Sequence, residues 1–217
     1  MQIELKRIAF SEQLSEETLA FSADVYINGY KAGYASNNGH GGSTDYRSYD
    51  EKGRSLINEA EKYCKSLPPE VSEDIVIDGK PMVTEMTLEY FIDNLIQKHV
   101  ENKALKAFNQ KIDKYAKNGI VYGIENVEFG TVKFAHRSIE ELLNKPEGQE
   151  LLKRTIINSV LPELHANPGY KILNKNIPQD IIDSAILHGK NAQLIKQKKR
   201  EIKPPDKPGK QRSAKRK

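Results

Sequence analysis

Several residue types are scarce in this chain of 217 residues, and each scarcity excludes a class of protein. Tryptophan is absent and Cys64 is the only cysteine. One cysteine cannot form an internal disulfide and cannot by itself build a structural zinc site. No stretch approaches the roughly 18 apolar residues of a membrane-spanning helix. Residues 1–7 also lack the basic start and apolar run of a secretory signal. We therefore expect a cytoplasmic protein with no metal site and no membrane partner.

Catalytic signatures are equally scarce. The sequence contains no Gly-x-Ser-x-Gly elbow, no His-Glu-x-x-His helix and no Walker-type or dinucleotide-type glycine loop. Cys64 lies on the apolar stripe of a predicted helix, which favours a small buried side chain over a nucleophile. We assign no catalytic residue and expect no cofactor, so a protein that is not an enzyme is favoured.

Charge is distributed unevenly along the sequence. The whole chain has 34 basic and 30 acidic residues and a formal net charge of +4. Residues 196–217 hold 11 of the basic residues and two acidic ones, so this segment is +9 and residues 1–195 are −5. Its prolines and its lack of apolar side chains predict a disordered tail. Such a tail binds phosphate backbones by releasing counterions, without reading sequence. A solubilising tail, or one that folds back on the acidic body, is the alternative.

The basic side chains that we assign to non-specific nucleic-acid contact are Lys196, Lys198, Lys199, Arg200, Lys210, Arg212, Lys215, Arg216 and Lys217.

The first 68 residues predict a small antiparallel meander packed on one helix. Residues 2–10 alternate loosely between apolar and polar, and residues 19–27 alternate clearly. Asn28-Gly29 follows, and both residues tolerate the positive φ of a type I′ hairpin turn. That turn predicts three residue pairs with all six side chains on one face: Ile27 with Tyr30, Val25 with Ala32, and Ala23 with Tyr34.

A further strand and a helix complete this module. Residues 44–49 predict the strand, and Asp50 is a good N-cap for a helix that ends at about Leu67, before Pro68-Pro69. Five of the ten tyrosines fall in residues 26–49, beside Lys31 and Arg47. Aromatic side chains next to basic ones can stack on bases, but they also suit strands through packing alone.

Residues 19–67 resemble the β-β-β-α half of a double-stranded RNA-binding domain. The resemblance lies in the order of elements and in the strand Val-Tyr-Ile-Asn-Gly-Tyr-Lys of residues 25–31, and it covers less than a quarter of the chain. The family carries a lysine cluster at the start of this helix, where Lys52 and Arg54 stand here. The family's first helix has no counterpart, because residues 2–10 predict a strand. The resemblance implies contact with duplex RNA.

Residues 69–195 predict a mainly helical region. Residues 70–84 are expected to be a linker with a short hairpin at Asp78-Gly79. A helical pattern then occupies residues 85–117, and Asn118-Gly119 predicts a left-handed end. At 1.5 Å per residue this helix reaches roughly 50 Å, so it is a spine, breaks near Asn102, or joins copies of the chain.

The rest of this region predicts a small hairpin and three further helices. The hairpin has strands at residues 120–124 and 131–135, and Ser138 caps a short helix. A helix at 147–164 should bury Leu151, Leu152, Ile156, Val160 and Leu164, residues 170–173 are extended, and a last helix follows Pro178. The predicted fold class is α+β, in segments 1–68, 69–195 and 196–217.

Two segments are candidate phosphate or ligand sites. Gly39, His40, Gly41 and Gly42 form a glycine-rich loop whose backbone N–H groups could cradle an anion, with His40 as acid, base or phosphate contact. His136-Arg137 follows a predicted strand and precedes the helix capped by Ser138, where the pair could grip a phosphate. The alternatives are a flexible connection built of turn-forming residues and a solvated strand end.

These observations leave three hypotheses for function. The first is a non-enzymatic accessory protein of a bacterium or phage, which contacts nucleic acid through its tail and a protein through its acidic body. The origin follows from a Lys-, Asn- and Ile-rich composition. The second is a phosphate-handling enzyme or nucleotide binder that uses the glycine loop. The third is a structural protein that oligomerises through residues 85–117.

Overall fold

The computed structural model describes residues 1–189. The fold is α+β, as the sequence predicts. The basic residues assigned to nucleic-acid contact, all between 196 and 217, lie outside the described residues. The chain divides into two compact units, Met1–Lys106 and a second unit that begins at Ala107. The division therefore falls within a helix, whereas the segments expected from the sequence divide at residue 68.

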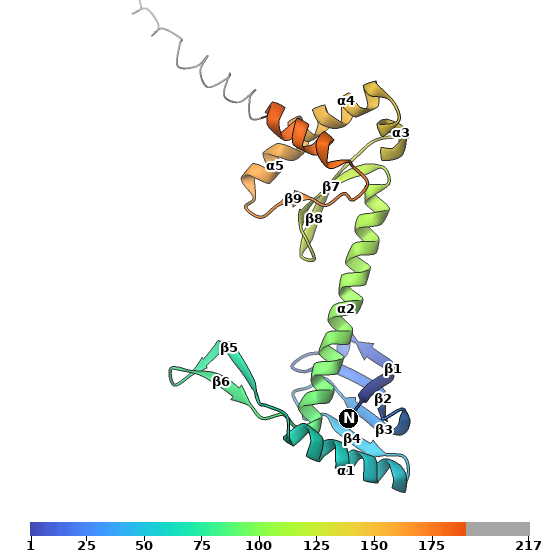
Figure 1. Ribbon diagram of the computed structural model, residues 1–217, viewed down its shortest axis with the longest axis vertical. Coiled ribbons are helices and arrows are strands. Elements are labelled where there is room, and N and C mark those ends of the chain that lie inside the picture. Colours follow the sequence, from blue (N-terminus) through green and yellow to red (C-terminus); the bar gives the residue numbers. More distant parts are fainter. Residues whose placement is uncertain (190–217) are drawn as a thin grey trace, which may run out of the picture. The chain divides into compact units, whose positions relative to one another are not determined.

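The first unit is built on the predicted four-stranded meander (Figure 1). Each strand pairs with the next one along the chain, and all pairs are antiparallel. The turn at Asn28-Gly29 has φ values of 48° and 80°, as a type I′ hairpin requires. The strands are β1 (Ile3–Ser11), β2 (Ala20–Ile27), β3 (Tyr30–Asn37) and β4 (Asp45–Ser48), with a 3₁₀ turn η1 (Glu12–Leu14) after β1.

The predicted register of β2 and β3 holds only beside the turn. Ile27 pairs with Tyr30, but Val25 pairs with Gly33, so Ala32 is an extra residue in a bulge. Tyr34 consequently pairs with Asp24, on the opposite face from the one predicted. Ala35 takes the predicted place of Tyr34 opposite Ala23, and both Ala32 and Ala35 are fully buried. The bulge therefore puts alanine rather than tyrosine on the buried face of this part of β3.

Helices α1 (Glu51–Lys65) and α2 (Leu88–Ala116) complete the core of the first unit. The Asp50 carboxylate accepts the Gly53 N–H at 2.6 Å, which confirms the predicted N-cap. Burial raises the pKa of Cys64, whose side chain is fully buried as predicted. The module predicted to rest on one helix therefore rests on two, since the first turns of α2 join its core. The buried residues from the helices are Ile57, Ala60, Cys64, Leu88, Ile92 and Ile96.

A hairpin between α1 and α2 forms a separate two-stranded sheet. It consists of β5 (Glu70–Ile77) and β6 (Lys80–Thr84), joined at Asp78-Gly79 with φ values of 51° and 75°. The predicted hairpin is confirmed, and it occupies nearly the whole stretch expected to be linker. We call Glu70–Thr84 the arm.

The second unit has its own small sheet. Strands β7 (Gly119–Ile124) and β8 (Glu128–Lys133) form the predicted hairpin, although β8 begins three residues earlier than expected. A third strand, β9 (Lys171–Ile172), pairs with the other edge of β7. The predicted left-handed cap at the end of α2 is wrong, because neither Asn118 nor Gly119 has a positive φ and Gly119 already belongs to β7.

The helices of the second unit follow the predicted order. They are α3 (Ile139–Leu143), α4 (Pro146–Thr155), a π turn η2 (Ile156–Val160), α5 (Leu161–Ala166) and a helical stretch at residues 179–189. The π turn explains why the predicted long helix is interrupted: Pro162 has no N–H, and Leu161 donates to the Ile156 carbonyl five residues back. Leu151 is exposed, contrary to prediction. The core of this unit includes Leu152, Ile156, Val160 and Ile182.

Candidate functional site

The glycine-rich loop is organised by Asn37, at the end of β3. Its side-chain oxygen, Oδ1, accepts hydrogen bonds from the Thr18 hydroxyl and the Gly39 N–H, both at 2.8 Å. Its amide donates to the Gly42 carbonyl at 2.9 Å and to the Thr44 hydroxyl at 3.2 Å. One side chain thus joins both ends of the loop to the start of β2. This network gives the loop defined hydrogen-bond partners at both of its ends.

Most backbone N–H groups of the loop already donate hydrogen bonds within the protein. His40 N–H donates to the Asn38 side chain, and Gly41 N–H donates to the Thr18 hydroxyl. The carbonyl of Gly39 in turn accepts three N–H groups, from residues 16, 17 and 18. Since an anion nest requires N–H groups that point at the ligand, these contacts take three of the four N–H groups of the predicted cradle, those of Gly39, His40 and Gly41.

The charges around the loop also oppose a phosphate. His40 Nδ1 lies 3.1 Å from Glu16 Oε2, and both side chains are exposed. A Cβ placed on Gly41 would meet the carboxylate of Glu17, which shows how closely that carboxylate approaches the loop. Two carboxylates therefore stand where an anion would arrive, and the surroundings suit a cationic or neutral polar group better.

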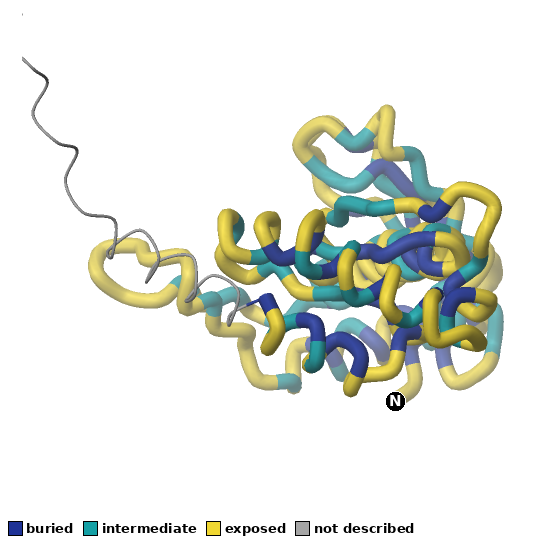
Figure 2. Tube along the Cα trace, turned by 90° about the horizontal axis from the view of Figure 1, so that it is seen from above, coloured by how far each residue is buried: buried dark blue, intermediate teal, exposed yellow. Residues whose placement is uncertain are grey.

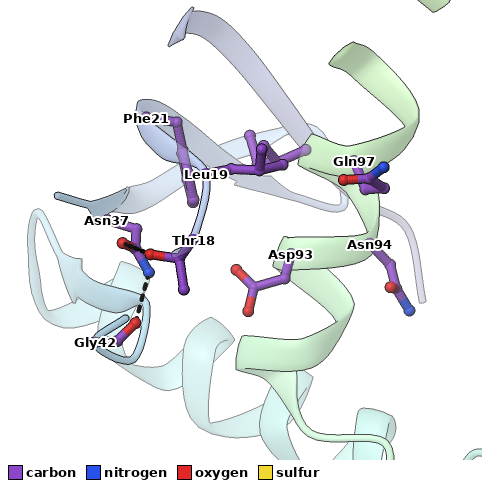
Figure 3. A pocket seen from close by; sticks show the side chains of 9 residues that line it. Thr18, Leu19, Phe21, Asn37, Gly42, Asp93, Asn94 and Gln97 are labelled. Atoms are coloured by element: carbon purple, nitrogen blue, oxygen red, sulfur yellow. Dashed lines mark hydrogen bonds between the residues drawn. The ribbon is translucent and has the colours of Figure 1, made fainter. Parts of the chain in front are cut away.

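A cleft of about 260 Å³ lies between this loop and α2. Figure 3 shows Asp93, Asn94 and Gln97 of α2 on one side of it and Thr18, Asn37 and Gly42 on the other. Leu19, Phe21 and Ile96 supply its apolar lining. Thr44 links the two sides, because its hydroxyl donates to Asp93 at 2.6 Å and its N–H donates to Glu89 at 3.0 Å.

Asp93 is the titratable group of this cleft. Burial raises its pKa, the hydrogen bond from Thr44 lowers it, and the nearby Glu89 carboxylate raises it further, with a net rise. A half-buried carboxylate beside amides and hydroxyls can hold a small polar or cationic group. Periodicity alone would not have selected Asp93, because it lies among ordinary polar positions of a helical pattern.

His136 and Arg137 belong to the second unit, whereas the glycine loop belongs to the first. His136 adopts a left-handed φ of 58°, and both residues line a groove with Glu141, Lys145 and Glu147. The helix end that was expected to hold a phosphate is closed by a capping box: Ser138 accepts the Glu141 N–H, and Glu141 accepts the Ser138 N–H. The Glu141 carboxylate takes the place predicted for a phosphate.

The outer face of the first sheet carries a charged cluster that sequence reasoning missed. Asp24 is buried and interacts with Arg7, with Lys31 at 3.3 Å and with the Tyr49 hydroxyl at 2.7 Å. Lys31 lies over the Tyr49 ring. Arg7, Lys31 and Tyr49 all contact the Asp24 carboxylate, so the basic and aromatic side chains of this face have their partners within the face.

The arm carries the other feature that the sequence did not reveal. Its strand pattern predicts a hairpin, but not that the apolar side chains stay exposed. The side chains of Val71, Ile75, Val76, Ile77 and Val83 are each more than half exposed. Figure 2 shows the hairpin, at the left of the molecule, drawn mostly in the exposed colour.

Within residues 1–189, no group of three or more histidine, cysteine, aspartate or glutamate side chains is placed to hold a metal ion. No helix in that range is long and apolar enough to cross a lipid bilayer.

In comparisons with known proteins, no family model, no curated protein and no solved structure matches this chain.

Proposed function

We propose that this chain is a non-enzymatic accessory binding protein of a bacterium or phage, which links nucleic acid to a protein partner. The basic C-terminal segment takes the nucleic acid, and the first unit takes the protein. The observation that carries the proposal is the uneven distribution of charge along the chain.

Charge separates by unit as well as by sequence position. Residues 1–106 contain 12 basic and 18 acidic residues, a net charge of −6. Residues 107–189 contain ten of each and are neutral, and residues 190–217 contain 12 basic and two acidic ones, a net charge of +10. A surface of −6 repels phosphate, whereas a segment of +10 attracts it. The two ends of the chain therefore suit different partners.

The candidate sites support binding rather than catalysis. Around the glycine loop the N–H groups of Gly39, His40 and Gly41 are taken, and the carboxylates of Glu16 and Glu17 stand beside it. Beside His136 the Glu141 carboxylate fills the helix end. These carboxylates disfavour a phosphoryl group at either place, so binding is favoured over phosphate chemistry.

The nucleic-acid half is tested by fluorescence anisotropy with duplex DNA, duplex RNA and single strands over a range of salt. The test variant replaces five residues of the full chain by glutamine: Lys210, Arg212, Lys215, Arg216 and Lys217. The matched control replaces five exposed lysines of α2 by glutamine: Lys98, Lys103, Lys106, Lys111 and Lys114. Both variants lose the same formal charge, so only position differs.

The expected result is a loss of affinity confined to the tail variant. The slope of log affinity against log salt should fall by roughly 4 for duplex DNA, because each neutralised contact contributes about 0.9. Equal losses in both variants would contradict the assignment to the tail. Duplex RNA binding that survives in the tail variant would instead support the resemblance of β2, β3, β4 and α1 to half of a double-stranded RNA-binding domain.

A further inference from the structure

One face of the arm carries four apolar side chains. Cross-strand pairing puts Val71 opposite Val83 and Val76 opposite Pro81. Pro81 and Val83 share a face because they are two residues apart in β6, and paired residues lie on the same side of a sheet. All four are exposed. A protein surface seldom leaves such a group uncovered unless it is a contact site.

Neither edge strand of the arm suits pairing with an added strand. A partner would therefore contact the apolar face of the arm. The register of β5 breaks between Ser72 and Val76, which leaves residues 73–75 as a bulge. Pro81 removes one backbone N–H from β6. Bulges and prolines are the devices that prevent edge pairing between sheets. A partner that lays an apolar patch on the face avoids both obstacles.

The arm is tied to the first unit only near its base. The Asn94 amide of α2 donates to Glu70 at 3.1 Å, at the first residue of β5. Beyond this point the hairpin forms a sheet of only two strands. An isolated two-stranded hairpin is marginally stable in water and gains stability when its apolar face is covered. Covering the face therefore stabilises the arm itself as well as the complex.

The net charge of the arm indicates which kind of partner it can bind. Residues 70–84 contain Glu70, Glu73, Asp74 and Asp78 against one basic residue, Lys80, so the arm is −3. A second copy would bring the same acidic side chains together, which is unfavourable. The basic segment 196–217 has the right charge, but Ile202 and Ala214 are its only aliphatic residues and cannot cover the face. Nucleic acid is excluded by its charge.

We infer that the arm is the docking surface for a basic protein, which covers Val71, Val76, Pro81 and Val83 with an apolar patch bordered by lysine or arginine. This inference rests on the protein-partner half of the proposed function and names its surface. The contact is small compared with a stable interface of about 800 Å² per partner, so the binding is transient unless other parts of the first unit add to it.

The test uses the full chain and three synthetic helical peptides as probes. One peptide has a leucine face bordered by lysine, one a leucine face bordered by glutamate, and one has glutamine in place of leucine and keeps the lysines. The variant is Val76→Ser with Val83→Ser, which changes the apolar face without changing charge. Ile77→Ser on the same arm and Val127→Ser in the second unit are matched controls, since both residues are equally exposed.

The expected result is binding of the leucine–lysine peptide, weakened roughly tenfold or more by the double substitution and little by either control. Equal binding of the leucine–glutamate or the glutamine–lysine peptide would overturn the inference, and so would binding that the double substitution leaves unchanged. A concentration-dependent dimer in sedimentation that the double substitution removes would overturn it in favour of a second copy.

The readouts separate this inference from the proposed function. Tail substitutions that leave nucleic-acid affinity unchanged contradict the proposed function and do not alter peptide binding to the arm. If the chain binds the peptides without selectivity while the tail still binds nucleic acid, only the inference about the arm is contradicted. The melting temperature of the double variant is compared with that of the original chain, so that a loss of binding is not confused with unfolding of the first unit.

Discussion

The Tyr49 hydroxyl donates a hydrogen bond to Asp24 at 2.7 Å, across the outer face of the first sheet. Asp24 lies in the middle of β2, and Tyr49 follows β4. Tyr34, which the bulge at Ala32 places opposite Asp24, packs against the Tyr49 ring on the same face. Burial alone would raise the pKa of Asp24, but the hydrogen bonds from Tyr49, Arg7 and Lys31 outweigh it and lower the pKa.

Asp24 is expected to make the first unit sensitive to acid. Its pKa is lower in the folded chain than in the unfolded one, so its stabilising contribution is present above the unfolded value of about 3.9 and is lost as pH falls through the folded value. Tyr49→Phe removes one cause of the lowering and about 1 kcal/mol of stability. Melting temperature between pH 2 and 7 checks this: the acid-induced loss should be smaller in the variant and should be complete at a higher pH, because the folded pKa moves towards the unfolded one. Identical profiles would contradict it.

Asp93→Asn is expected to stabilise the chain at neutral pH. The pKa of Asp93 is raised chiefly by burial, so the ionised carboxylate destabilises the fold, and stability falls as pH rises through the folded value. Asparagine keeps an oxygen for the Thr44 hydroxyl and carries no charge. We expect a rise in melting temperature of roughly 2 °C at pH 7, because the half-exposed group is partly screened.

The pH dependence of this effect is its control. Below about pH 3 the aspartate is protonated in both states, so the difference between Asp93→Asn and the original chain should vanish. A constant difference from pH 3 to pH 7 would attribute the effect to packing and not to charge.

Asn37→Ala is expected to destabilise the first unit much more than His40→Ala. Asn37 makes four hydrogen bonds that hold the glycine loop, and leaving its partners unsatisfied costs roughly 2 kcal/mol. His40 is exposed and contacts only the exposed Glu16, so its removal changes stability by less than about 0.5 kcal/mol. Urea unfolding followed by tyrosine fluorescence compares them. A larger effect at His40 would reverse this account of the loop.

Gly53→Ala is expected to destabilise the chain although Gly53 lies in a helix. Alanine in place of glycine within a helix normally gains about 1 kcal/mol. Here a Cβ would lie 2.1 Å from the Ala32 carbonyl oxygen, which is held by the Tyr49 N–H at 3.0 Å and cannot move freely. A loss of roughly 1–3 kcal/mol is expected.

Asn58→Ala, at an exposed position of the same helix, is the control for Gly53→Ala. It should gain a few tenths of a kcal/mol from helix propensity alone. Thermal unfolding of both variants separates the two causes. A gain in both would mean that α1 can move away from β3.

Local features of this chain follow from neighbouring residues, and the sequence determined them. Asn28-Gly29 specifies its turn because both residues accept positive φ, and Asp50 begins α1 because its carboxylate reaches an N–H three residues on. The apolar spacing of residues 88–115 is helical, and α2 is the longest described element. The charge partition that motivates the proposed function is likewise a property of the sequence.

The tertiary structure alone decided the features that depend on distant residues. Whether Ala35 or Tyr34 lies opposite Ala23 depends on the bulge at Ala32, whose carbonyl packs against Gly53 of α1, and no pattern within β3 records that contact. The N–H groups of Gly39 and Gly41 donate to Asn37 and Thr18, and the helix end beside His136 is filled by Glu141. These contacts oppose an anion at both predicted sites, and they are known only once the partners are placed.

The arm demonstrates the same division. Alternation and a turn are enough to predict β5 and β6, because hydrogen bonds within a hairpin are local. Whether valine side chains at residues 71, 76 and 83 are buried depends on what the rest of the chain packs against them, and in the first unit α1 and α2 cover the four-stranded sheet instead. Burial is a property of the whole fold, so exposure of the apolar face could be found only from the tertiary structure.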